Sequence, residues 1–130
     1  MKEPPVLLVV DDQPFFLTLH ANMLRPKGYT VATAPNAAQG FAEAKRLLPD
    51  LILLDVEMPD EDGFALCGRL KADPATALTP VILLTATKDR KLNERAFQAG
   101  AEATVVKSMN VERLLNIVKV VLETERLSSG

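Results

Sequence analysis

Short aliphatic runs alternate along this chain with longer segments in which apolar residues recur every three or four positions. The runs have the length of strands that are buried on both faces of a sheet. They cover residues 6–10, 30–33, 51–54, 81–84 and 103–106. Strands that alternate with helices predict an α/β fold, in which helices cover both faces of a single doubly wound, five-stranded parallel sheet.

The segments between these runs carry the signals of helices. Pro14 suits the first turn of a helix that ends before Pro26, and Asn36 with Gln39 resembles the capping box of a second helix. Later segments around residues 64–70, 92–97 and 111–122 keep helical spacing, and the last has the cleanest apolar stripe.

Four residues on these helical segments have a predicted burial. Met23, Phe41 and Cys67 continue apolar stripes, and we therefore expect them in the core. His20 lies within the first helical pattern without a metal ligand or a base spaced around it. It is interpreted as a surface or partly buried helix residue and not as a phosphate donor.

Length and composition indicate one domain spanning residues 1–130. We expect its core at about residues 5–123 and a polar tail at 124–130. A formal net charge of −2 gives no general attraction for nucleic acid or for an acidic membrane surface. The single cysteine excludes an internal disulfide, and no apolar run reaches the roughly 18 residues that span a bilayer. The composition predicts a soluble, cytoplasmic protein without direct nucleic-acid or membrane contact.

Polar residues stand where four of the five predicted strands end. Asp11 and Asp12 follow the first strand, Asp55 the third, Thr85 the fourth and Lys107 the fifth. Each alone is weak evidence, because a carboxylate after a strand is most often a helix cap or a turn residue. In a doubly wound sheet, however, ligands bind at the carboxyl ends of the strands. We therefore expect three acids, a hydroxyl and an ammonium at one edge of the sheet.

This combination of groups narrows the chemistry. Two carboxylates about 4 Å apart repel each other by roughly 4 kcal/mol at an effective dielectric constant near 20, so clustered acids shift their pKa values or bind a cation. Oxygen ligands without His or Cys favour Mg²⁺, which keeps waters and binds phosphate oxygens. A carboxylate can also act as a nucleophile and form an aspartyl phosphate. The residues thus predict Mg²⁺-dependent phosphoryl transfer onto an aspartate.

Four stretches, VLLVVDDQP, LILLDVEMPDEDG, VILLTA and VVK, occur in this order and spacing. Together they resemble the receiver domain of two-component response regulators, including the chemotaxis-regulator type, over most of the chain. The resemblance implies a flavodoxin-like sheet with the strand order 2-1-3-4-5. It also implies a phosphorylation-switched signalling module, which catalyses its own phosphoryl transfer and autodephosphorylation but is not an enzyme acting on an external metabolite.

The same resemblance assigns roles to the residues at the strand ends. Asp55 would be the phosphoacceptor, and its phosphoryl group would come from a phosphohistidine of a sensor histidine kinase or phosphotransfer protein, or from a small phosphodonor. Lys107 would pair with the phosphoryl group, and Thr85 would move to bond one of its oxygens. The Mg²⁺ ligands would be Asp11 (mainly through a water), Asp12, Asp55 and the backbone carbonyl of Glu57.

Phosphorylation would change the face formed by the fourth helix, fifth strand and fifth helix. The implied partners are an upstream kinase, a downstream effector protein or fused output domain, and a second copy of the chain in a phosphorylation-dependent homodimer. The sequence identifies neither the kinase nor the output.

Two positions depart from the family pattern. Ser108 stands where a proline with a cis peptide bond commonly follows the lysine, and a cis bond before Ser would cost about 2.5–4 kcal/mol. Val105 stands at the position that we assign to the family's aromatic switch residue, and it has no large ring to reorient. We therefore hypothesise that the signal passes through shifts of loops and helices after the fourth and fifth strands.

Acids crowd the segment that follows Asp55. We interpret Asp60, Glu61 and Asp62 as a solvated loop and the cap of the next helix. The side chain of Glu57 is expected to point towards the entrance of the site, where it would tune the lifetime of the phosphoryl group.

Other functions compete with a phosphorylated receiver. An aspartate-nucleophile phosphohydrolase would carry DxDxT after its first strand, whereas here the candidate acceptor follows the third. A nucleotide or flavin binder would carry a P-loop or GxGxxG after the first strand, which this chain lacks. The main alternative is a degenerate receiver that acts only as a protein-interaction module, although the complete set of polar residues argues against it.

Overall fold

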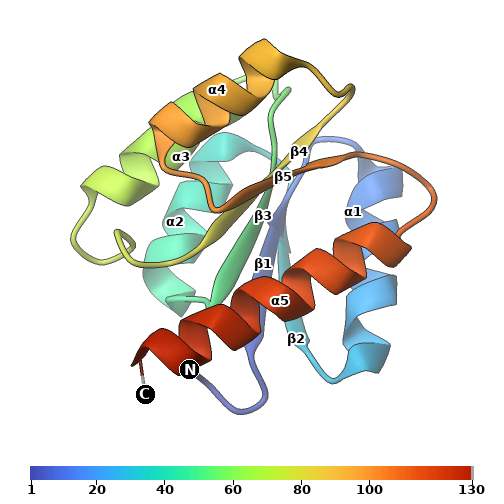
Figure 1. The fold of residues 1–130 in the computed structure, drawn as a ribbon, viewed down its shortest axis with the longest axis vertical. Helices are drawn as coiled ribbons and strands as arrows, with labels where there is room; N and C mark the ends of the chain where they lie inside the picture. Colours follow the sequence, from blue (N-terminus) through green and yellow to red (C-terminus); the bar gives the residue numbers. More distant parts are fainter. Residues whose placement is uncertain (130) are drawn as a thin grey trace.

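The computed structural model describes residues 1–129, in which five strands and five α-helices alternate (Figure 1). The strands are β1 (Val6–Val10), β2 (Thr30–Ala34), β3 (Leu51–Asp55), β4 (Val81–Thr85) and β5 (Ala103–Val106). The helices are α1 (Pro14–Leu24), the 3₁₀ helix η1 (Arg25–Lys27), α2 (Ala37–Leu47), α3 (Gly63–Ala72), α4 (Arg90–Ala99) and α5 (Glu112–Ser129). All the predicted strands are confirmed; β2, β3 and β4 each extend one residue further than the sequence indicated.

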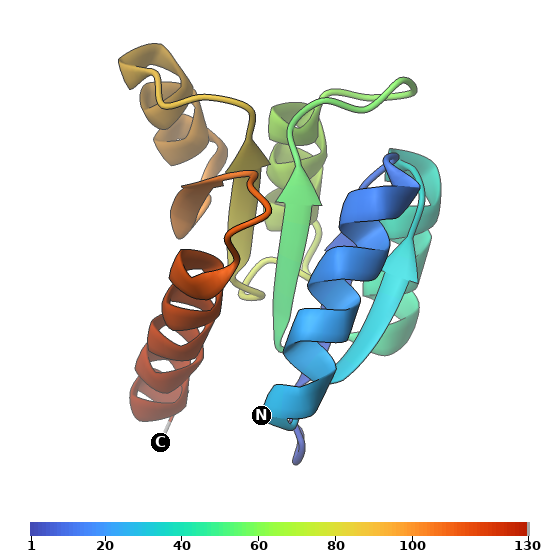
Figure 2. The same ribbon diagram turned by 90° about the vertical axis from the view of Figure 1, so that its right-hand side faces the viewer.

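All neighbouring strands pair in parallel, in the order β2-β1-β3-β4-β5. This confirms the predicted fold class and strand order. Because β2 pairs with one side of β1 and β3 with the other, the loops after β1 and β3 diverge at the switch point of the sheet. Figure 2 shows the strand arrows pointing to a common edge, which is where the predicted site residues stand.

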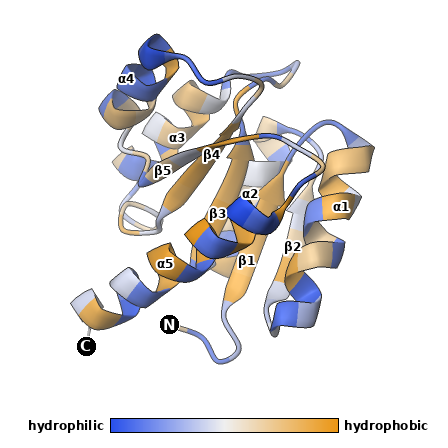
Figure 3. Ribbon diagram, turned by 45° about the vertical axis from the view of Figure 1, so that its right-hand side comes forward, coloured by the Kyte–Doolittle hydropathy of each residue, from blue (hydrophilic) through white to orange (hydrophobic). Residues whose placement is uncertain are grey.

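Two apolar layers hold the sheet between the helices. Leu8 and Ile52 belong to the layer under α2, α3 and α4, whereas Leu7 and Leu53 belong to the layer under α1 and α5. β3 and β4 are buried along their whole length, as expected of strands that are covered on both faces. In Figure 3 these strands are orange, while blue residues gather on the outer faces of the helices. The strand ends at the site are therefore anchored in a packed interior.

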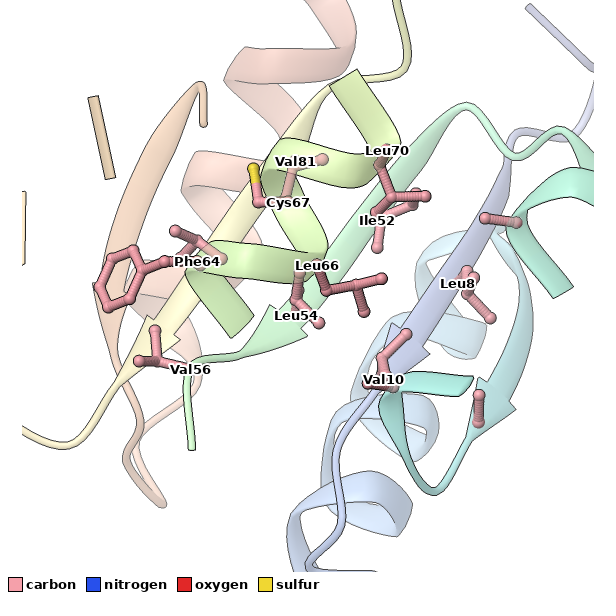
Figure 4. Packing of buried hydrophobic residues seen from close by; sticks show 14 of the residues in the cluster. Leu8, Val10, Ile52, Leu54, Val56, Phe64, Leu66, Cys67, Leu70 and Val81 are labelled. Atoms are coloured by element: carbon pink, nitrogen blue, oxygen red, sulfur yellow. The ribbon is translucent and has the colours of Figure 1, made fainter. Parts of the chain in front are cut away.

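The neighbouring helices α3 and α4 are anchored very differently. Figure 4 shows side chains of α3, among them Leu66 and Leu70, packed beside Ile52 of β3. α3 buries half of its residues, whereas α4 buries only Ala96. Phe97 of α4, which continued the predicted apolar pattern, is 82% exposed. α4 is thus a lightly anchored helix beside a firmly packed one.

Three of the four predictions of burial need comment. Met23 is 41% exposed, so its assignment to the core was wrong, and His20 is 1% exposed, so its assignment to a surface or partly buried position was also wrong. α1 turns His20, Ala21 and Leu24 towards the sheet, and this face leaves Met23 outside. Phe41 is only partly buried against the core. Cys67 is fully buried, as predicted, and burial raises the pKa of its thiol to about 11.

The N-terminus of α2 and the C-terminus of α5 test two of the predictions made from the sequence. Asn36 accepts a hydrogen bond from the backbone N–H of Gln39 at 2.8 Å, which confirms the predicted cap of α2. α5 continues through Ser129, so the polar residues 124–129 prolong the helix, and Gly130 lies outside the described residues. Among the helices of residues 1–129, none is long and apolar enough to cross a membrane.

Candidate functional site

The site is built around three carboxylates at the switch point. Asp11 and Asp12 directly follow β1, and Asp55 is the last residue of β3, which pairs with β1. One oxygen of each carboxylate lies within 4.8 Å of an oxygen of the others. Asp11 is 0% exposed and Asp55 is 5% exposed, while Asp12 is half-buried. The predicted acidic cluster is therefore formed by two neighbouring strand ends.

Lys107 brings a positive charge to this cluster from the end of β5. Its backbone N–H donates to the Thr85 carbonyl oxygen at 2.7 Å, which ties the end of β5 to the end of β4. Its ammonium nitrogen lies 2.8 Å from Asp11 Oδ2 and 3.2 Å from Asp55 Oδ2. The two ion pairs join residues that are far apart in sequence.

The charges of the site are not balanced. Burial, together with the neighbouring Asp11 carboxylate, raises the pKa of Asp55 to about 6, although the Lys107 ammonium opposes this rise. Asp11 Oδ2 is buried without a well-aligned hydrogen bond, despite its short distance to Lys107. Three carboxylates facing one ammonium, with only oxygen atoms as ligands, could hold a metal ion.

The cleft over the cluster has a volume of about 660 Å³. Asp12, Asp55, Glu57, Ala86 and Lys107 contribute to its lining, with Asp11 buried beneath it. Glu57 is exposed, and its backbone N–H lies 3.3 Å from Asp55 Oδ1.

Thr85 stands apart from this cleft. Its hydroxyl donates to the Thr87 carbonyl oxygen at 2.9 Å, within the loop that leads to α4. It lines a second groove, of about 670 Å³, together with Asn93 of α4, Thr104 of β5 and Arg113 of α5. The structure therefore brings the acids and Lys107 together but turns the hydroxyl of Thr85 towards α4.

The loop after Asp55 is fixed by close backbone packing. A Cβ atom on Gly63 would lie 2.3 Å from the Asp55 carbonyl oxygen and 2.7 Å from Val56 Cα, so this position requires glycine. The Gly63 N–H also donates to the Val56 carbonyl oxygen at 2.8 Å. Asp62 caps α3 by accepting from the Phe64 N–H at 2.6 Å, which confirms the predicted cap.

The other acids of this loop have partners that sequence reasoning missed. Asp60 accepts from the N–H groups of Ala37 and Ala38, and so it caps α2 and not the next helix. These two hydrogen bonds lower the pKa of Asp60. Glu61 pairs with Arg69 at 2.5 Å. No sequence pattern links Asp60 to a helix N-terminus that lies more than 20 positions earlier in the chain.

Three further residues at the site had not been singled out. Gln13 accepts from Lys107 Nζ at 2.5 Å, and the ring of Phe16 lies 4.6 Å from the same nitrogen. Arg95 of α4 lines the cleft, pairs with Asp62 at 3.0 Å and lies over the Phe64 ring. Gln13 and Phe16 follow Asp12 closely in the sequence, and that proximity was the available signal.

The structure settles two questions raised by the departures from the family pattern. The one cis peptide bond in residues 1–129 joins Glu3 to Pro4, so the bond between Lys107 and Ser108 is trans. Val105 packs in the layer under α1 and α5, on the opposite face of the sheet from Thr85, and therefore cannot turn together with it. Assigning the switch position to Val105 was wrong.

Thr104 is the β5 residue that faces α4. Strand alternation places Thr104 on the opposite face from Val105, and its hydroxyl donates to Asn93 Oδ1 at 2.9 Å. Thr104 and Thr85 line the same groove.

Comparison with known proteins agrees with this geometry. The sequence profile of the response regulator receiver domain matches residues 7–119. The DNA-binding dual master transcriptional regulator RpaA of Synechocystis is 38% identical over 124 residues, which are 95% of this chain and 52% of RpaA. Protein PilH of Pseudomonas aeruginosa is 34% identical over 117 residues, which are 89% of this chain and 96% of PilH. The chain thus spans about half of RpaA and only 23% of the response regulator PleD of Caulobacter vibrioides.

Solved structures show the same fold. The chemotaxis protein CheY4 of Vibrio cholerae is similar with a TM-score of 0.86 at 28% identity, over 90% of this chain and 98% of CheY4. The BeF3-activated receiver domain of Klebsiella pneumoniae RstA is similar with a TM-score of 0.82 at 27% identity, over 90% of this chain and 97% of that domain. By fold and by sequence, therefore, the chain belongs to the response regulator receiver domain family, the signalling modules of two-component systems.

Proposed function

We propose that this domain is switched by phosphorylation of Asp55. The observation that carries the proposal is the cluster of Asp11, Asp12 and Asp55 at the ends of two adjacent strands, with the Lys107 ammonium bonded into it. A buried carboxylate beside a metal site and a fixed cation is suited to attack phosphorus. The domain, with its core at residues 5–123, acts on itself and not on an external metabolite.

Mg²⁺ fits the ligands that the site offers. Asp12, Asp55 and the backbone carbonyl of Glu57 would hold it, with Asp11 acting through a water. All the donors are oxygen atoms, and the imperfectly bonded Oδ2 of Asp11 is available. When bound, Mg²⁺ offsets the negative charge of the acids and of an incoming phosphoryl group.

The chain's own residues then carry the transfer. A carboxylate oxygen of Asp55 attacks the phosphorus of a phosphohistidine; the new O–P bond forms as the P–N bond breaks, and its electron pair leaves with the imidazole. Lys107 neutralises the phosphoryl oxygens, and the Thr85 hydroxyl leaves Thr87 to donate to one of them. In autodephosphorylation a water oxygen bonds to phosphorus and gives up a proton to solvent. The O–P bond to Asp55 breaks, its electron pair restores the carboxylate, and inorganic phosphate leaves. Glu57, exposed at the cleft, tunes the rate of that second step.

The output follows from the contacts that Thr85 gives up. Moving its hydroxyl to the phosphoryl group frees the Thr87 carbonyl oxygen, and the loop before α4 then rearranges. α4 is lightly anchored, and its Asn93 is bonded to Thr104 of β5. The face of α4, β5 and α5 therefore changes through loop and helix shifts, with Thr104 in the place first assigned to Val105.

The partners follow from this cycle. The phosphodonor is a sensor histidine kinase, a phosphotransfer protein or a small phosphodonor in the cytoplasm. The changed face binds an effector protein, a fused output domain or a second copy of the domain. RpaA, described as DNA-binding, has about twice the length of this chain, and PilH has nearly the same length. Relatives of this domain therefore include both a longer DNA-binding regulator and a protein of nearly the same length.

The test is to incubate the protein with Mg²⁺ and acetyl phosphate, and separately with beryllofluoride. Intact-protein mass spectrometry should show one added phosphoryl group, which is lost in Asp55→Asn and in metal-free buffer. Backbone NMR with beryllofluoride should show shifts in the loop before α4 and in β5. A folded wild-type protein that responds to neither reagent would instead be a degenerate receiver that acts only by binding partners.

A further inference from the structure

The ammonium of Lys107 has no hydrogen to spare. Its nitrogen donates to Gln13 Oε1 at 2.5 Å, to Asp11 Oδ1 at 2.9 Å and to Asp55 Oδ2 at 3.2 Å, and the ring of Phe16 covers it at 4.6 Å. A lysine ammonium has three hydrogens and accepts none. Any new acceptor must therefore displace one of the three oxygens.

These contacts pull Lys107 to one side of the site. Asp11, Gln13 and Phe16 all belong to the segment that joins β1 to α1, and the two polar contacts from it are shorter than the contact with Asp55. The Gln13 backbone is fixed, because its N–H donates to Asp11 at 2.9 Å and its carbonyl accepts from the Leu17 N–H at 3.0 Å. Its side chain, in contrast, lines the open cleft.

On the basis of the proposed phosphorylation of Asp55, we infer that Gln13 is a positioning residue that holds Lys107 back from the phosphoryl group. A phosphoryl group on Asp55 places its oxygens farther out in the cleft than the carboxylate oxygens. The Lys107 ammonium must therefore move outward to pair with them. The neutral amide of Gln13 accepts a hydrogen bond from an ammonium less strongly than a carboxylate does, and Gln13 is exposed. Its hydrogen bond is therefore the one that breaks. Gln13 thereby lowers the affinity of the site for a phosphoryl group and sets how readily the domain is switched.

Two substitutions of nearly equal shape separate this role from a structural one. Gln13→Met removes the acceptor, and Gln13→Glu replaces it with a charged one that holds the ammonium more strongly. At saturating Mg²⁺, we expect beryllofluoride to bind about three- to tenfold more tightly to Gln13→Met, as one lost hydrogen bond allows. Gln13→Glu should bind it at least about tenfold more weakly. The rate of phosphorylation by acetyl phosphate should follow the same order.

The controls distinguish the possible failures. Gln39→Met and Gln39→Glu alter an exposed glutamine of α2 and should leave the affinity unchanged. A separate Mg²⁺ titration of each variant corrects for the charge added at position 13. In ¹⁵N spectra of Lys107 side chains, the ammonium hydrogens of Gln13→Met should exchange with water faster than those of the wild type.

If wild-type protein does not bind beryllofluoride, the proposed function itself fails. If it binds, but the Gln13 variants agree with it within about twofold, the restraint by Gln13 does not exist. Weaker binding by Gln13→Met would overturn the inference in the opposite sense, because Gln13 would then assist the phosphoryl group.

Discussion

α3 and α4 have the same length and lie next to each other, yet they are held by different forces. α3 is fixed by apolar side chains in the interior. α4 fully buries only Ala96, packs Leu92 and Ala99 partly buried against the same core, and adds polar contacts. Asn93 bonds to β5 and Arg95 pairs with Asp62. Apolar burial is insensitive to a local charge, but polar contacts can be exchanged one for another. Under the proposed phosphorylation of Asp55, the difference indicates that α4 is the helix that responds and α3 the helix that supports the acceptor.

The largest expected effect tests the firm side of this comparison. Leu66→Ala should lower the free energy of unfolding by about 2–5 kcal/mol, because it leaves a cavity in the packed layer. Phe97→Ala, on the exposed face of α4, should change it by less than about 0.5 kcal/mol. Urea unfolding of both variants measures this contrast. Similar losses would show that α4 is as firmly anchored as α3.

The next effect concerns the charge at the end of β3. Because the folded pKa of Asp55, about 6, lies above the ordinary value of 3.8, the folded state favours its neutral form. This stabilisation is fully present below about pH 3.8 and is lost as the pH rises through 6. In metal-free buffer at pH 7.5, Asp55→Asn should therefore be more stable than wild type by about 1–2 kcal/mol, discounted for solvent at the open rim.

Urea titrations at pH 7.5 and pH 4 measure that difference, and it should nearly vanish at the lower pH. Adding Mg²⁺ at pH 7.5 should stabilise the wild type more than the variant. A difference independent of pH would mean that Asp55 carries no electrostatic strain in the folded state.

The smallest effect tests the loosely held side. Thr104→Val removes the hydrogen bond to Asn93 and should cost less than about 1 kcal/mol of global stability. Amide hydrogens of α4 should nevertheless exchange faster, while those of α3 keep their wild-type rates. Thr104→Ser keeps the hydroxyl and serves as the matched control. Equal acceleration in α3 and α4 would argue against separate behaviour of the two helices.

The sequence was sufficient for the strands and the acidic cluster for a simple reason. Uninterrupted aliphatic runs mark strands buried on both faces, and the parallel arrangement brings residues 11, 12, 55 and 107 to one edge. The face of the sheet on which a side chain lies is harder to predict from the sequence, because an error of one position moves the side chain to the other face. Val105 and Thr104 show this effect. The predicted burial of Met23 and of His20 was wrong for a similar reason, because the residue pattern of α1 does not define a clear apolar face.

Contacts between segments that are distant in the sequence were the hardest to predict. Asp60 caps a helix that precedes it, and Gln13 bonds to a lysine that is 94 positions away. Such contacts depend on how loops fold over the sheet, and no local periodicity encodes them.

The caps and ion pairs of the loop after Asp55 also bear on how the proposed phosphodonor would approach. Asp60 lies at the N-terminus of α2, while Glu61 and Asp62 pair with Arg69 and Arg95. Of the four acids that follow Asp55 in this loop, all within the described residues, Glu57 is the one whose side chain makes no ion pair or helix cap. Under the proposed phosphorylation, an incoming anionic donor therefore meets a weaker repulsive field than the letters DVEMPDED suggest.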